Sequence, residues 1–145
     1  MARNVTYSVV PRYNPSEKGM PPKYYAQAQA SGDVSLREMA ERIQQTCTVT
    51  KADVYATLVA MEDVIIAALK AGEIVRLGDL GTLQIGLSGK GALSEEDYDP
   101  SLIKKARINF RTGVALAGVL TSLTYSKVAK RSSPNSEENG EMSDL

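Results

Sequence analysis

The sequence predicts an α+β fold, and three patterns support that prediction. Apolar residues recur at helical spacing through residues 35–71, which predicts two consecutive helices. Two alternating runs, residues 74–77 and 82–87, flank a glycine-containing turn and predict a β-hairpin. The 145 residues are 43% hydrophobic and 23% charged, close to the averages of globular domains. A chain of this composition and length can bury a core.

The first 34 residues predict a β extension that precedes the helices. Residues 5–10 are mostly β-branched and aromatic and predict a strand. The four prolines between residues 11 and 22 predict a loop, because proline cannot donate ladder hydrogen bonds. Residues 24–30 alternate small apolar with polar side chains and predict a second strand. We expect the two strands to pair as a hairpin with a long connection.

Both expected helices begin at capping residues. Ser35 and Glu38 match a capping box, in which the Ser35 hydroxyl accepts from the Glu38 amide and the Glu38 carboxylate reaches back. This first helix is expected to end near Thr46. Thr50 caps a longer helix, residues 51–71, and the glycine that follows predicts its end.

The longer helix is apolar on two sides. One stripe contains Val54, Leu58, Met61, Ile65 and Leu69, and a second contains Tyr55, Val59 and Ile66. A helix with such wide apolar sides needs cover from more than one direction. Two interpretations stay open at this point: a central core helix within one protomer, or a helix covered by another subunit. The small neighbouring elements favour the second interpretation.

Beyond the hairpin, the chain predicts an irregular arm, a strand, a short helix and a closing strand. The expected ranges are 88–101 for the arm, 106–110 for the strand, 112 or 113 to about 120 for the helix, and 123–128 for the closing strand. We expect these elements to complete a domain of residues 35–131. Residues 132–145 contain four acidic side chains and almost nothing to bury, which predicts a disordered acidic tail.

The composition excludes several classes of chemistry. The chain has no histidine, which removes Ser-His-Asp catalysis and the H-E-x-x-H zinc helix, and we expect no enzymatic activity, metal or cofactor. Cys47 is the single cysteine and cannot form an internal disulfide, which favours the cytoplasm. The net charge is zero, yet residues 90–131 carry eight basic and four acidic side chains. This asymmetry fits a polyanionic partner.

Three motifs occur in a characteristic order. They are Thr50-Lys51-Ala52-Asp53-Val54 at the entry of the long helix, residues 72–83 with their Gly-hydrophobic-Gly turn, and Ile108-Asn109-Phe110-Arg111-Thr112-Gly113 at a strand-to-helix junction. Together they resemble the bacterial histone-like HU and integration-host-factor family over about residues 35–123. The extra N-terminal strands and the closing strand resemble the variant HU-like proteins of the Bacteroides group.

This resemblance implies an intertwined homodimer, or a dimer with a paralogue, that binds double-stranded DNA. An α-helical body would carry a β-saddle from both subunits and two β-arms, with no membrane or small-molecule partner. The implied role is architectural, in organising the bacterial chromosome in the cytoplasmic nucleoid. The dimer interface is expected at Val54, Leu58, Met61, Ile65, Leu69 and Phe110.

The basic strand before the short helix is the candidate DNA site. Lys105, Arg107 and Asn109 alternate and therefore share one face of the strand. Contacts from Lys and Arg to phosphates supply most non-specific affinity for DNA. The alternative that the residues leave open is a row of solvated charges on an exposed sheet. The full set of candidate DNA-binding residues is Arg76, Lys90, Lys104, Lys105, Arg107, Asn109 and Arg111.

The arm departs from the family pattern. Family arms are rich in Arg and carry an Arg-Asn-Pro-x-Thr-Gly tip, whose proline wedges between base steps. Here residues 88–101 contain Lys90, four acidic residues and no such tip, and Pro100 lies at the wrong end. We therefore predict largely sequence-independent binding with modest bending. The alternative hypothesis is an HU-fold module that makes protein contacts and has little DNA affinity.

Overall fold

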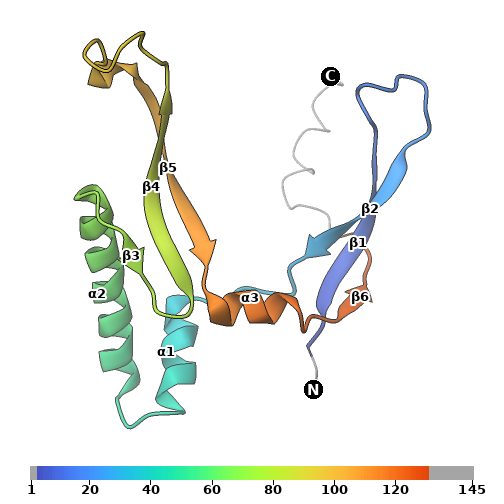
Figure 1. Ribbon diagram of the computed structural model, residues 1–145. Helices are drawn as coiled ribbons and strands as arrows, with labels where there is room; N and C mark the ends of the chain where they lie inside the picture. Colours follow the sequence, from blue (N-terminus) through green and yellow to red (C-terminus); the bar gives the residue numbers. More distant parts are fainter. Residues whose placement is uncertain (1–2, 131–145) are drawn as a thin grey trace, which may run out of the picture. The chain divides into compact units, whose positions relative to one another are not determined.

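The computed structural model describes residues 3–130, which fall into two units (Figure 1). One unit contains residues 3–33 and 123–130, and the other contains residues 34–122. Each unit has its own three-stranded sheet, and the α-helices described belong to the second unit. The predicted α+β class is confirmed. The predicted acidic tail, residues 132–145, lies outside the described residues.

Strands from both ends of the described chain build the sheet of the first unit. β1 (Val5–Arg12) is central, pairing antiparallel with β2 (Lys23–Gln29) and parallel with β6 (Tyr125–Lys127). The Val128 amide donates to the Tyr7 carbonyl at 2.8 Å, which extends the parallel pairing. The predicted hairpin is confirmed. The domain boundaries stay a prediction, although β6, which falls in the predicted domain of residues 35–131, pairs with the N-terminal strand.

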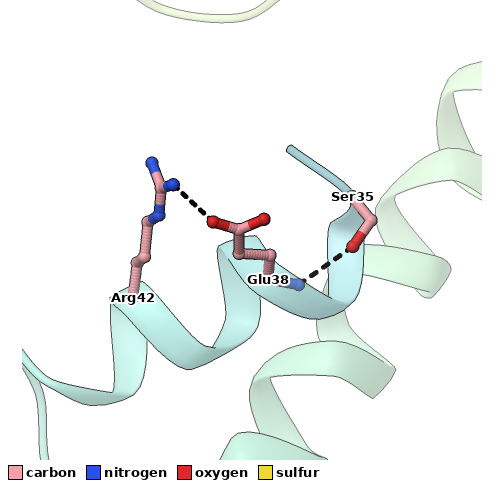
Figure 2. A network of polar contacts seen from close by, with 3 residues as sticks. All are labelled: Ser35, Glu38 and Arg42. Carbon is pink, nitrogen blue, oxygen red and sulfur yellow. Dashed lines mark hydrogen bonds and ion pairs between the residues drawn. The ribbon is translucent and has the colours of Figure 1, made fainter. Parts of the chain in front are cut away.

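The two main helices form where the caps predict them. α1 spans Leu36–Gln44 and α2 spans Lys51–Lys70. The Ser35 hydroxyl accepts from the Glu38 amide at 3.2 Å, and the Thr50 hydroxyl accepts from the Asp53 amide at 3.3 Å. The reciprocal half of the expected capping box is absent from α1, because the Glu38 carboxylate pairs with Arg42 one turn later (Figure 2). An i,i+4 ion pair is an alternative use of the same carboxylate.

A second ion pair joins α1 to α2. The Lys51 ammonium donates to the Glu41 carboxylate, ten residues earlier in the chain. This hydrogen bond, with the attraction of the same ammonium, lowers the pKa of Glu41. Because the pKa of Glu41 is lowered, the pair stabilises the fold at pH values above the ordinary pKa of a glutamate. This stabilisation is lost as the pH falls through the lowered pKa. Because the pair is exposed, its contribution is small.

The sheet of the second unit consists of the predicted hairpin and the strand that follows the arm. β3 (Val75–Arg76), β4 (Gly81–Gly89) and β5 (Ile103–Thr112) pair antiparallel in that order, and a 3-10 turn, η1 (Pro100–Leu102), precedes β5. β5 is longer than the predicted 106–110. α3 (Val114–Leu120) follows, and the Gly113 amide at its start donates to the Leu80 carbonyl at 2.8 Å. That bond fixes the strand-to-helix junction against the hairpin turn.

The described chain has a very small core of its own. Ala40 and Val54 are the buried apolar side chains of the described residues, at 0% and 7% exposure. On α2, Val64 and Ile66 remain 66% and 51% exposed. α2 therefore keeps large apolar side chains exposed on more than one side. None of the helices described is long and apolar enough to cross a membrane.

Candidate nucleic-acid interface

The register of the second sheet places the basic strand opposite small and polar residues. Lys105 faces Ser88, Arg107 faces Gly86 and Asn109 faces Gln84 across the β4–β5 ladder. Directly opposed residues project to the same side of an antiparallel sheet, and alternate residues of one strand share that side. The three side chains therefore lie on one face with their polar partners.

The same register adds an arginine from each edge of the sheet. Thr82 of β4 opposes Arg111 of β5 on one side and Arg76 of β3 on the other. These three residues therefore form a row across all three strands, on the side that already holds Arg107. We call this side the polar face; it consists of Arg76, Thr82, Gln84, Gly86, Ser88, Lys105, Arg107, Asn109 and Arg111.

Gly86 gives the polar face its close packing of side chains across the strands. A Cβ at this position would lie 2.4 Å from the Asn109 amide nitrogen and 3.4 Å from Cγ of Arg107. The two side chains thus lean over the Gly86 backbone. A glycine here leaves room for both, because any larger residue would have to displace the Asn109 amide.

The cations of the polar face are free to meet an external anion. Its four basic residues are exposed, and the face contains no carboxylate. In residues 3–130 the ion pairs are Arg42–Glu38 and Lys51–Glu41, so none of these four cations is paired within the chain. Uncompensated cations along a strand create a positive potential that attracts a polyanion.

Two predicted site residues lie apart from this arrangement. Lys104 has no partner in the β4–β5 register, because the pairing shifts at Ser88 and Gly89, and its ammonium donates to the Ser101 carbonyl at 2.8 Å. Lys90 follows the end of β4, where its amide donates to the Leu102 carbonyl at 3.0 Å. Both lie toward the arm, beyond the paired stretch that forms the polar face.

The arm carries negative charge rather than the positive charge of the face. Between β4 and β5 lie Lys90 and the four acidic residues Glu95, Glu96, Asp97 and Asp99. Hydrogen bonding by the Ser101 side chain, and secondly by its backbone amide, lowers the pKa of Asp99 and keeps its carboxyl charged. Leu93 is fully exposed here. Because of this negative charge, the arm is a poor partner for phosphates.

The reverse side of the same sheet is apolar. It holds Val75, Leu83, Ile85, Leu87, Ala106, Ile108 and Phe110 in register. We call it the apolar face. Leu87 and Ile108 are 62% and 63% exposed, and Phe110 is 50% exposed. The predicted interface includes Phe110 but omits Leu87 and Ile108, although strict alternation along both strands was the signal that could have found them.

The other predicted interface residues divide between the protomer's own packing and its surface. Val54 is buried within the chain, and Leu58, Ile65 and Leu69 are half-buried there. Met61 is 42% exposed. The first stripe of α2 thus packs largely within one protomer, and the exposed apolar surface lies on other sides of the helix. Whether these residues also meet a second copy stays a prediction.

Comparisons with known proteins address the family and the fold. A family model described as an HU domain fused to a wHTH, Ig or glycine-rich motif matches residues 3–127. No curated protein matches the sequence. A crystal structure of a protein from Bacteroides vulgatus, described provisionally as a bacterial DNA-binding protein, is similar with a TM-score of 0.60 and 15% identity. The match covers 90% of this chain and 51% of that protein, so the chain spans about half its length.

Proposed function

Because the chain belongs to the family of HU domains fused to a wHTH, Ig or glycine-rich motif, we propose that it is an architectural protein that binds double-stranded DNA as a homodimer. The resemblance to HU-like proteins is confirmed by the family match. The observation that carries the proposal is the polar face, where Arg76, Lys105, Arg107 and Arg111 lie together without a carboxylate. Such a face can contact the phosphates of a duplex. The protein would act in the nucleoid.

Binding through this face is largely independent of sequence. Phosphate contacts position a protein on the duplex but carry no information about the bases. The arm provides neither cations nor the family's proline wedge, so the duplex bends modestly. Affinity then depends on backbone charge and on how easily the duplex deforms.

The apolar surface left uncovered on one protomer supports the proposed homodimer. The apolar face of the sheet and the exposed side of α2 that holds Val59 and Ile66 both need cover. A second copy that buried such surface would gain about 25 cal/mol for each Å² removed from water, which would add to the stability of a protomer whose own core is so small. Pairing two protomers also doubles the number of cations available to one duplex.

The arm favours a second candidate function, a protein-contact module on the same fold. Its acidic residues repel phosphates, while the fully exposed Leu93 and the 46% exposed Tyr98 are typical of a protein-binding surface. This candidate predicts an arm that meets a protein and a polar face with little affinity for DNA. A titration with duplex DNA separates the two.

We expect random duplex DNA to bind with an affinity that falls steeply with salt. Eight polar-face cations in a homodimer would give a slope of about −7 for log K against log salt concentration, and partial engagement a shallower one. Fluorescence anisotropy over a salt series measures the slope, with several unrelated duplexes expected to give equal affinities. An anisotropy that stays flat at low salt would contradict DNA binding and favour the protein-contact module.

A further inference from the structure

Two cations face each other beside the connecting loop of the β1–β2 hairpin, in the unit to which the polar face does not belong. Arg12 and Lys23 are the last pair of the ladder and are directly opposed. Like charges in this position are about 5 Å apart at Cβ and destabilise a hairpin by some tenths of a kcal/mol. An anion bound between the two side chains would attract both of them and offset their mutual repulsion.

The arginine of this pair is held by an aromatic ring. The Arg12 guanidinium carbon lies 5.8 Å from the centroid of the Tyr25 ring, which is a cation–π distance. Tyr25 is two residues beyond Lys23 on β2 and opposes Val10, so it shares a face with both cations. Stacking leaves the guanidinium edge, with its fork of N–H donors, free for a ligand.

A hollow of about 400 Å³ lies at this end of the hairpin. Arg12, Lys23 and Tyr25 line it together with Tyr13 and Asn14, which add polar groups. Glu17 is the one carboxylate in the lining, and it makes no ion pair with either cation in the described structure. The hollow therefore contains two cations without an ion-pair partner, beside one carboxylate and the apolar side chains of Pro15, Met20 and Pro21.

The whole unit carries a net positive charge. Residues 3–33 and 123–130 contain six basic side chains, Arg3, Arg12, Lys18, Lys23, Lys127 and Lys130, against Glu17 and Asp33. This gives a net charge of +4, which draws anions toward the unit and favours a polyanion over an isolated ion.

We propose that Arg12 and Lys23, oriented by Tyr25, form a second phosphate site that binds the backbone of the DNA duplex. This assignment rests on the proposed function, since it adds a contact for the same ligand. Arg bonds a phosphate with two parallel N–H groups, and Lys adds a point charge from the opposite strand. The N-terminal strands thereby become part of the DNA-binding surface.

The test uses the full chain with Arg12→Gln and Lys23→Gln combined. Removing one neutralised phosphate per protomer of a dimer should make the salt slope of duplex binding shallower by about 1.8. The matched control is Lys127→Gln with Lys130→Gln, which removes two exposed cations from the same unit and should leave the slope unchanged. The charge-retaining pair Arg12→Lys with Lys23→Arg should keep the slope. Glu17→Gln should tighten binding, because it removes the competing carboxylate.

The outcomes separate this site from the proposed function. If the unaltered protein fails to bind the duplex at low salt, both fail together. If it binds with a steep slope that the Arg12/Lys23 double variant shares with the control, the second site alone is wrong. Inorganic phosphate is titrated in parallel while the Tyr25 ring is followed by NMR. Saturation below about 1 mM phosphate, an affinity typical of a dedicated small-ligand site, would assign the site to free phosphate and overturn its assignment to the DNA backbone.

Discussion

Replacing Lys105, Arg107 and Arg111 together by Ala is expected to weaken duplex binding by roughly a hundredfold or more at 0.15 M salt. The three cations lie on the polar face with no partner among residues 3–130, so the substitutions abolish their phosphate contacts and leave the fold intact. In a dimer the change removes six cations, and each phosphate that is no longer neutralised takes about 0.9 from the salt slope. The reduction in affinity should be equal for all duplex sequences.

The control for this variant removes the same charge elsewhere. Lys70, Lys127 and Lys130 are exposed and lie outside the polar face, so their replacement by Ala should change affinity only slightly. Anisotropy titrations of both triple variants, at matched salt, make the comparison. An affinity of the Lys105/Arg107/Arg111 variant equal to that of the control would remove the polar face from the DNA site.

Ile66→Asp is expected to convert the dimer to monomers. Ile66 is 51% exposed on the single protomer, so the aspartate is tolerated there, whereas at a covered interface it becomes a buried, unpaired charge that costs several kcal/mol. A substitution at Val54 would be less informative, because its burial at 7% exposure makes it part of the protomer's own core. Light scattering at micromolar protein measures the mass, which should halve.

Thr57→Asp is the matched control for this variant. It introduces the same charge in the same helix, at an exposed position nine residues from Ile66, which is the opposite side of the helix. Its mass should equal that of the unaltered dimer, and circular dichroism should show the same helix content in both variants. A dimeric Ile66→Asp protein would place the interface away from this side of α2.

Local signals in the sequence account for most of the elements. The caps Ser35 and Thr50 place the starts of α1 and α2, and alternation along residues 105–111 predicts the shared face of the basic strand. Alternation alone could not say what lies opposite. Arg76 and Arg111 lie in one row because both oppose Thr82. This row depends on the register of three strands, which pair residues that are far apart in the sequence.

The differences from the sequence predictions also have non-local causes. β5 extends beyond residues 106–110 because β4 supplies ladder partners from Gly81 to Gly89, out to Ile103 at one end and Thr112 at the other. The pairing of Arg12 with Lys23 spans the loop of residues 13–22, so their net charge is visible in the sequence but their juxtaposition is not. The Glu38 carboxylate could bind either the Ser35 backbone amide, as in a capping box, or the Arg42 guanidinium, and in the structure it pairs with Arg42.

The mass of the complex with a short random duplex tests the central claim most directly, because it reports pairing and DNA binding at once. Sedimentation at low salt should give one complex containing two protomers per duplex, which dissociates into dimers and free DNA as salt is raised. A single protomer that sediments separately from the duplex at low salt would contradict the account.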